Sequence, residues 1–454
     1  MSNVYMSFLG TNDYLECLYY QNQNFHQCRF VQEATISFYC HDWTADDRIV
    51  IFTTKEADIR NWQDDGHKDY HTGQAKKIQG LKTRILQMNL QASVEQVIIP
   101  SGIDENDIWT LFNQIYDQLH EKDKVIFDIT HAYRTIPLFA IVVLNYAKIM
   151  KEIQLQGIYY GALETLGSIN DAKLKSPENR RVPIVDYTAL DQLLEWTSAI
   201  DQYIKTGNAN DIGKLTESQA RSRLSKSKGK DRFLHSFRKL GESLQTFSMD
   251  MATVRGLSIT SDIQRVKANI NDCSDIDLVA PFKPVLSKIK ARMESFQGNP
   301  SSDYSIDHGI QAAQFCLDHN MIQQALTLIV ETMISYFLDR VGINPLDFST
   351  KTTNSYRQLV NQAIAIYVKD NQSKEKWLQH SPQLQPMKQK LLLCLDNHQK
   401  IINQYHTIND YRNDINHAGI NKDPKQAKVF KDKISNFLSI LPGNIATIDT
   451  RLKS

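Results

Sequence analysis

The sequence predicts an α/β domain followed by an all-helical domain, and three observations support this prediction. Residues 1–187 alternate short runs of β-branched and aromatic residues with segments of helical periodicity. Residues 188–454 contain long helix-periodic segments that are nearly free of strand signals. The chain of 454 residues is also about three times as long as a typical domain of ~150 residues, so more than one domain is expected.

Short apolar runs that end at turn-forming residues predict the strands of the first domain. Between two of them, residues 106–122 space their apolar side chains as one face of a helix, and Pro137 suits the first turn of a helix over residues 136–150. Strands that alternate with helices indicate a largely parallel, doubly wound, Rossmann-like sheet. The predicted strands are residues 4–10, 34–40, 48–54, 95–100, 124–130 and 155–163.

Helical periodicity dominates the second part of the chain. One segment of it is basic: residues 214–239 hold nine Lys or Arg against two Asp or Glu, which is typical of a solvated linker and loop and, less often, of a surface that guides RNA or phosphate. The predicted helices are residues 190–207, 231–254, 281–296, 321–342 and 387–419.

Composition and charge favour a cytoplasmic globular protein. The net charge of +1 means that any nucleic-acid or nucleotide binding must be local. Six cysteines without a C-x-x-C pair fit reduced thiols. No apolar run reaches the ~18 residues that span a bilayer, and the first residues do not resemble an export signal.

Two loops of the first domain are candidate ligand sites. Doubly wound sheets bind ligands where the carboxyl ends of their strands meet loops and helix N-termini. The first loop, Gly10, Thr11 and Asn12, follows the first predicted strand, although an ordinary turn would look the same. The second loop contains Asp128, Thr130, His131 and Arg134. No P-loop or G-x-G-x-x-G pattern follows a strand, so neither a P-loop NTPase nor a standard dinucleotide enzyme is indicated.

The stretch DYRNDINHAG, residues 410–419, is the candidate catalytic motif. Helical geometry predicts a buried face of Ile408, Tyr411, Ile415 and Ala418. It places the motif's polar side chains on the opposite, exposed face, with Asn413 and His417 one turn apart. These polar side chains are Arg412, Asn413, Asn416 and His417.

An arginine beside a histidine suits RNA cleavage without a metal. A histidine can take or give a proton near neutral pH, and an arginine can hold the scissile phosphate and stabilise its developing charge. One of each is a sparse site, so pairing the same helix across a two-fold axis would complete it and implies a dimer. Taken alone, the pattern also fits an ordinary wet helix face.

The order of these features resembles the CRISPR-associated ribonucleases that join a CARF sensor domain to a HEPN nuclease domain. The resemblance rests on FLGTNDY near the start, FDITHAYRTIP in the middle and YRNDINHAG near the end. Arg412 and His417 match the R-x-x-x-x-H motif of HEPN domains. Ala132 stands where these CARF loops more often have glycine.

The resemblance implies a dimeric accessory ribonuclease of type III CRISPR immunity. Its CARF domain, residues 1–187, would bind cyclic oligoadenylate, more plausibly the tetra-adenylate than the hexa-adenylate. Connecting helices, residues 188–300, would precede a HEPN core, residues 301–454, that cleaves single-stranded RNA without metal or cofactor and leaves a 2′,3′-cyclic phosphate. Arg412, Asn413 and His417 would be catalytic. The activator-binding residues would be Gly10, Thr11, Asn12, Asp128, Thr130, His131 and Arg134.

Three alternatives remain open. The chain could be a non-catalytic nucleotide sensor that signals to a partner through its helical domain, or a metal-dependent nuclease. His67 and His71 have the i, i+4 spacing of a metal pair, but the polar, Gly-flanked segment makes this reading weak. Glu331, in an apolar helix, is expected to be a buried or interface carboxylate paired with a base.

Overall fold

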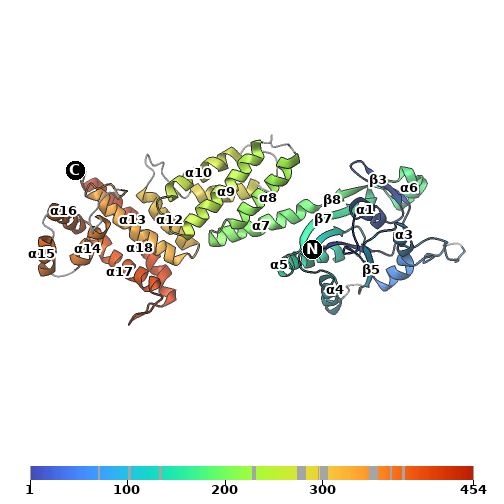
Figure 1. Cartoon of the computed structure of the whole chain (residues 1–454), viewed down its shortest axis with the longest axis horizontal. Coiled ribbons are helices and arrows are strands. Elements are labelled where there is room, and N and C mark those ends of the chain that lie inside the picture. The colour runs from blue at the N-terminus through green and yellow to red at the C-terminus, as the bar shows by residue number, and fades with distance from the viewer. Residues whose placement is uncertain are drawn as a thin grey trace. The chain divides into compact units, whose positions relative to one another are not determined.

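The computed structural model divides the chain into two compact units, residues 1–194 and 195–454, which are described separately (Figure 1). The division falls within a helix, a few residues beyond position 187. The described residues are 2–69, 72–100, 104–131, 135–226, 232–273, 283–294, 296, 305–346, 356–368, 371–380 and 384–452.

Unit 1 contains an eight-stranded mixed sheet in the order β3-β2-β8-β7-β6-β1-β4-β5. Pairing is parallel between β1 and both β4 and β6, between β4 and β5, between β6 and β7, and between β2 and β8, so the sheet is largely parallel as predicted. The strands are β1 Asn3–Leu9, β2 Cys17–Gln21, β3 Asn24–Cys28, β4 Arg48–Thr53, β5 Ser93–Ile98, β6 Lys124–Asp128, β7 Gln154–Gly161 and β8 Arg181–Asp186.

Residues 34–40 are not a strand, which corrects one sequence prediction. They lie in helix α1, Val31–Tyr39, which begins where the Glu33 carboxylate accepts the Phe30 backbone N–H at 3.0 Å. The first six residues of α1 are all buried, so the sequence shows no amphipathic alternation and its β-branched residues look strand-like. The antiparallel hairpin β2–β3 and strand β8 were not predicted.

Helices cover both faces of the sheet (Figure 1). Alternate residues of β1 point to opposite faces: Val4, Met6 and Phe8 join one core cluster, and Tyr5 and Leu9 join another. The first cluster contains α4 Glu105–Asp117 and α5 Thr135–Met150, and the second contains α1 and α3 Leu81–Gln87. The remaining helical segments of unit 1 are α2 Lys55–Ala57, η1 Asp58–Trp62, η2 Leu163–Leu166, α6 Ile169–Leu174 and η3 Pro177–Asn179.

In its described residues, unit 2 is helical throughout, as the sequence predicts. The predicted helix 387–419 is instead two helices, which meet at Asn397 and His398. His398 is buried, and its Nε2 atom lies 2.8 Å from the Tyr336 hydroxyl, so the chain turns inward there without Gly or Pro. The helices are α7 Thr188–Thr206, α8 Asn210–Lys226, α9 Arg232–Ala252, α10 Ile259–Cys273, α11 Lys283–Glu294, α12 Ile306–Asp318, α13 Ile322–Arg340, α14 Tyr356–Tyr367, α15 Asn371–Gln379, α16 Gln385–Asp396, α17 Gln399–Asn416 and α18 Ala427–Leu452.

The basic segment 214–239 belongs mostly to helices α8 and α9, which corrects the expected linker and loop. These helices pack closely because Gly241 of α9 faces Thr216 of α8: a Cβ at Gly241 would lie 1.7 Å from Thr216 Oγ1. Residues 227–231, between the helices, lie outside the described residues.

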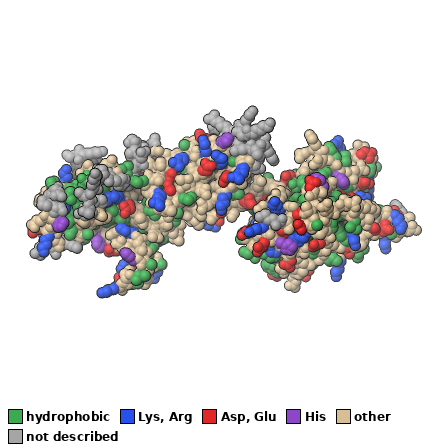
Figure 2. Space-filling view, viewed as in Figure 1, with side chains coloured by type: hydrophobic (Ala, Val, Ile, Leu, Met, Phe, Trp, Pro, Cys, Tyr) green, Lys and Arg blue, Asp and Glu red, His purple; other side chains and the backbone are tan. Residues whose placement is uncertain are grey.

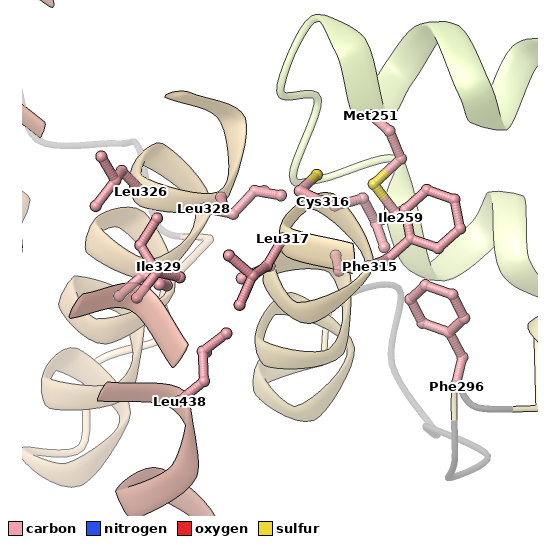
Figure 3. Close-up of a cluster of buried hydrophobic side chains, with 14 of the residues drawn as sticks. Met251, Ile259, Phe296, Phe315, Cys316, Leu317, Leu326, Leu328, Ile329 and Leu438 are labelled. Atoms are coloured by element: carbon pink, nitrogen blue, oxygen red, sulfur yellow. The ribbon is translucent and has the colours of Figure 1, made fainter. Parts of the chain in front are cut away.

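A single large cluster of buried apolar side chains forms the core of unit 2. In Figure 3, Met251, Ile259, Phe296 and Phe315 gather on one side of α12, and Leu317 and Leu328 lie between α12 and α13. The aromatic rings of Phe247, Phe296 and Phe315 meet at centroid distances of 5.3–6.0 Å. The nuclease-like motif therefore stands on a packed helical scaffold.

Acidic and basic side chains are interspersed on the visible face of each unit (Figure 2). All six cysteines are free, and five of them are buried. Among the described residues, no helix has both the length and the apolar character needed to cross a bilayer.

Candidate functional site

The structure brings the two predicted ligand loops together at the carboxyl ends of β1 and β6. These strands pair in parallel, with Ser7 opposite Asp128, so the loops that follow them leave the sheet side by side. A Cβ added to Gly10 would lie 3.8 Å from the Cβ of His131. In the sheet, β4 and β5 lie on one side of β1, whereas β6 and β7 lie on the other side. The two loops therefore lie at the switch point of the strand order, where such sheets bind ligands.

Asp128 is a framework residue of this site. It is fully buried, and Thr130 donates to its Oδ1 atom through the backbone N–H at 2.9 Å and the hydroxyl at 2.5 Å. The hydroxyls of Tyr5 and Thr35 lie 3.0 and 3.3 Å from its Oδ2 atom. Burial raises the pKa of Asp128, and these hydrogen bonds oppose that rise. The carboxylate therefore shapes the loop rather than facing a ligand.

Thr130 is held by the same framework. Its hydroxyl donates to Asp128 and accepts the Gly161 backbone N–H at 2.8 Å, which ties the second loop to β7. Arg134 lies outside the described residues.

Among the described residues of the second loop, His131 is a buried side chain with an unpaired polar atom. It is only 9% exposed, its ring lies 4.2 Å from the ring of Tyr14, and its Nε2 atom has no hydrogen-bond partner in the described structure. Burial lowers the pKa of His131 to about 3, so the imidazole is neutral at pH 7. A neutral aromatic ring, tilted by 34° against a tyrosine ring and with one unpaired buried nitrogen, is a candidate for contact with a nucleobase.

Two residues of this site were missed by sequence reasoning. Tyr14 lies on His131, and Asn61 is a fully buried amide that binds the first loop through the carbonyls of Gly10 and Asn12, each at 2.9 Å. The run FLGTNDY contains Tyr14, and the position of this tyrosine directly after the first candidate loop could have predicted its place in the site. Asn61 stands in a polar stretch with no motif.

The structure describes only one member of the suggested histidine metal pair. The His67 Nε2 atom lies 3.0 Å from Asn61 Oδ1, and His71 lies outside the described residues. Across the described chain, no three His, Cys, Asp or Glu side chains are grouped to hold a metal ion.

In unit 2, the R-x-x-x-x-H motif lies at the C-terminal end of α17. The His417 N–H still donates to the Asn413 carbonyl at 3.0 Å, and the helix then ends because Ala418 and Gly419 take φ values of 55° and 69°. The Gly419 N–H closes this end on the Asp414 carbonyl at 2.8 Å. Arg412 and His417 thus stand on the last turn.

The predicted faces of this helix are only partly correct. Ile408 and Tyr411 are buried as predicted and Ile415 is half-buried, but Ala418 is exposed beyond the end of the helix. Arg412 and Asn413 are half-buried rather than exposed, whereas Asn416 and His417 are exposed. Helix α13 also contacts this end of α17, where Gln323 donates a 3.2 Å hydrogen bond to Asn416.

Arg412 is anchored but not fully paired. Its Nη2 atom donates to Asn409 Oδ1 at 3.0 Å, and its buried Nε atom has no partner among the described residues. Tyr405 lies two turns earlier on the same helix, and its buried hydroxyl also has no hydrogen-bond partner among the described residues. Burial and Glu331 raise the pKa of Tyr405, and the positive charges of Arg412 and Arg357 oppose this rise. The guanidinium thus has a buried Nε–H that no described acceptor satisfies.

Glu331 is paired with a base, as predicted, but it is not buried. Its carboxylate lies 2.7 Å from Arg357 Nη2, and its side chain is 51% exposed. Arg357 also donates to the Ser335 hydroxyl at 2.9 Å. This pair links α13 to α14 at the rim of a cavity of about 270 Å³.

The comparisons with known proteins match this architecture. Residues 4–164 match the family model of the CARF domain of the CRISPR system endoribonuclease Csx1, so unit 1 contains a CARF domain. Residues 192–301 match the model of the second domain of the CRISPR-associated protein MJ1674. These matches confirm the predicted fold class and the resemblance of the chain to CRISPR-associated proteins that carry a CARF domain.

One curated relative can be named. The CRISPR-associated protein MJ1674 of Methanocaldococcus jannaschii is 33% identical over 125 residues, which are 27% of this chain and 18% of that protein. The similarity thus covers less than a fifth of the relative's length.

Proposed function

We propose that the chain is an endoribonuclease of type III CRISPR antiviral defence that cyclic oligoadenylate switches on. The observation that carries the proposal is the motif of Arg412 and His417 on the last turn of α17, in a chain whose first unit contains a CARF domain. Csx1, whose CARF model matches, is described as an endoribonuclease. We assign residues 301–454 to a HEPN nuclease core that acts on single-stranded RNA in the cytoplasm.

The proposed cleavage uses the substrate's own 2′-hydroxyl and requires neither metal nor cofactor. His417 accepts the proton of the 2′-hydroxyl, whose oxygen forms a bond to phosphorus while the bond to the 5′-oxygen breaks. The leaving 5′-oxygen takes a proton from a His417 imidazolium, and the products are a 2′,3′-cyclic phosphate and a 5′-hydroxyl. Arg412 stabilises the charge that develops on the phosphoryl oxygens, and Asn413 supports the site.

The proposed activator site is the pair of loops after β1 and β6. His131, packed against Tyr14, would contact an adenine, and Gly10, Thr11 and Asn12 would lie against the phosphate backbone. The structure around Asp128 and Thr130 supports an indirect role for both, since their polar atoms are engaged in the framework. Cyclic tetra-adenylate is the first activator to test.

An apolar face of unit 1 supports a homodimer. The face consists of Trp109 on α4 and Val142, Tyr146 and Ile149 on α5, all 43–73% exposed. Phe112 connects the two helices, because its ring meets those of Trp109 and Tyr146 at 6.0 and 5.4 Å. A contiguous exposed apolar surface of this kind marks an interaction site, and we assign it to a second copy of the chain.

The test is RNA cleavage in EDTA. Labelled single-stranded RNA is incubated with the protein alone, with cyclic tetra-adenylate or with cyclic hexa-adenylate. We expect cutting with one activator, a 2′,3′-cyclic phosphate product, and a loss of at least about a hundredfold in Arg412→Ala and His417→Ala, since general acid–base catalysis contributes about 10²–10⁴-fold.

The matched control is His406→Ala, which removes an exposed histidine of the same helix and should keep full activity. Activator binding without RNA turnover would replace this proposal with the non-catalytic sensor. Cleavage that occurs in a parallel reaction with Mg²⁺ but not in EDTA would indicate a metal-dependent nuclease.

A further inference from the structure

The segment after β4 forms a clamp on the first activator loop. Since β4 neighbours β1, residues 54–80 begin beside that loop. They contain the short helix α2 and then η1, a π-helical turn in which the Gln63 N–H donates to the Asp58 carbonyl at 3.0 Å. Asn61 lies in this turn and is fully buried, although sequence reasoning gave it no role.

Side chains of this turn bind three successive carbonyls of the loop. Asn61 Nδ2 donates to the carbonyls of Gly10 and Asn12, each at 2.9 Å, and Arg60 Nη1 lies 3.5 Å from the Thr11 carbonyl. The chain has no cis peptide bond in its described residues. In a trans peptide the carbonyl and the following N–H point in opposite directions. The clamp therefore turns the next three N–H groups, those of Thr11, Asn12 and Asp13, away from the turn.

These three N–H groups are free to bind a ligand. In the described structure they donate to no protein acceptor, whereas the loop carbonyls are all directed to the clamp. Successive backbone N–H groups on one side of a turn form an anion-binding concavity. Arg29 at 3.1 Å and Lys76 at 2.5 Å compensate the negative charge of the nearby Asp13 carboxylate. This carboxylate therefore does not repel a bound anion with its full charge.

His67 fixes the orientation of the clamp. Because Asn61 Nδ2 donates to both carbonyls, Asn61 Oδ1 must accept, and the His67 Nε2–H at 3.0 Å is its donor. A flipped amide would set its oxygen against two carbonyl oxygens. Protonation of His67 keeps the same N–H, so the clamp does not depend on the charge of this residue.

We propose that Asn61 is a positioning residue of the activator site: it holds the N–H groups of Thr11, Asn12 and Asp13 toward a phosphodiester group of the activator, and His67 orients its amide. The inference rests on the proposed function, since it concerns the affinity of the same site. Asn61 itself faces the loop carbonyls and does not touch the ligand.

The test compares activator binding and RNA cleavage in Asn61→Leu, Asn61→Asp and His67→Ala proteins. Leu removes the two donors without adding charge, and Asp replaces them with acceptors. We expect the dissociation constant of the bound cyclic oligoadenylate, measured by calorimetry, to rise at least about tenfold in both Asn61 variants and less in His67→Ala. Cleavage at saturating activator should be unchanged, because the nuclease residues are untouched.

The control is Asn179→Asp, which makes the same change at an exposed amide of unit 1 that bonds only Ser176 in the described structure. Wild-type affinity in Asn61→Leu, or weakening in Asn61→Asp alone, would overturn the clamp and assign the effect to charge. If Asn61→Asp fails to fold, Asn61→Leu and His67→Ala decide. Failure of the wild-type protein to bind any cyclic oligoadenylate would instead overturn the proposed function, and the clamp with it.

Discussion

Asp128 and His131 are both buried at the carboxyl end of β6, yet they differ in what they leave for a ligand. The oxygens of Asp128 accept hydrogen bonds from Thr130, Tyr5 and Thr35. The Nε2 atom of His131 has no partner in the described structure. At the scale of single residues, hydrogen bonding therefore separates Asp128, which fixes the loop, from His131, whose buried Nε2 atom is unpaired.

The neutral state of His131 predicts a pH-dependent stability. Its pKa is about 3 in the folded protein and near ~6.5 in an unfolded chain, so below about pH 6.5 the unfolded chain binds a proton that the folded one does not. Above about pH 6.5 the unfolded chain does not take up this proton, and His131 has no effect on stability. As the pH falls from there toward 3, proton uptake by the unfolded chain lowers the free energy of unfolding by about 1.4 kcal/mol per pH unit. His131→Phe keeps an aromatic ring and should lose this slope.

The measurement is hydrogen exchange of the β1 and β6 amides across a urea series, which reports the opening of unit 1. Between about pH 6.5 and about pH 5, wild type should lose about 2 kcal/mol more than His131→Phe. His41→Phe, a change at an exposed histidine, is the control. Equal losses in wild type and His131→Phe would show that His131 is protonated in the folded state.

Sequence reasoning predicted the positions of the two candidate loops better than the contacts of their individual residues. The loops were predictable because parallel strands end at one edge of the sheet. The side-chain roles were not, because they depend on contacts between residues far apart in the chain: Asn61 binds Gly10 across 51 positions and Tyr5 meets Asp128 across 123.

At the scale of elements, helices α8 and α9 pack so closely that there is no space for a side chain at Gly241. Gly241 would place a Cβ 1.7 Å from Thr216 Oγ1, and Thr216 is buried. Such contact lets the two helix backbones approach closely. Gly213, on the same pair, would place its Cβ 3.0 Å from the end of the flexible Gln245 side chain.

Gly241→Ala should therefore destabilise unit 2 by about 1–3 kcal/mol, although alanine favours a helix over glycine by about 1 kcal/mol. Thr216→Ala in the same chain should restore part of that loss, because it removes the hydroxyl at 1.7 Å but keeps the Thr216 Cβ, which would lie 2.7 Å from the new Cβ. The measurement is the urea dependence of hydrogen exchange in α9. Gly213→Ala is the control and should be tolerated. No rescue by Thr216→Ala would show that the helices separate for another reason.

The elements that were mispredicted share a physical cause. Helix α1 is buried on all sides over its first six residues, so it lacks the polar stripe that marks a helix. The junction of α16 and α17 is fixed by the buried contact of His398 with Tyr336 rather than by a local breaker. Tertiary packing decides both, and a single sequence does not display it.

At the scale of the whole molecule, the proposed chemistry requires a second chain, because one chain supplies one Arg412 and one His417 to the site. The apolar face of Trp109, Val142, Tyr146 and Ile149 is the surface that we assign to that partner. Burying such side chains contributes about 25 cal/mol per Å² of apolar area removed from water.

Tyr146→Glu combined with Ile149→Glu should dissociate the dimer, because association would bury two uncompensated carboxylates per chain. Sedimentation velocity should show the mass of a single chain, and activator-dependent RNA cleavage should fall with it. Leu174→Glu is the control, since Leu174 is 88% exposed on α6, away from this face. An unchanged mass would place the dimer interface elsewhere.

The position of β8 has a consequence for the order of folding during synthesis. The β2–β3 hairpin joins the sheet through β8, where Leu18 pairs with Arg181. A lone two-stranded hairpin is marginally stable, and synthesis proceeds at about 5–20 residues per second. The hairpin must therefore wait on the order of ten to thirty seconds for β8 to leave the ribosome. We expect this interval to be when the nascent chain most depends on chaperones.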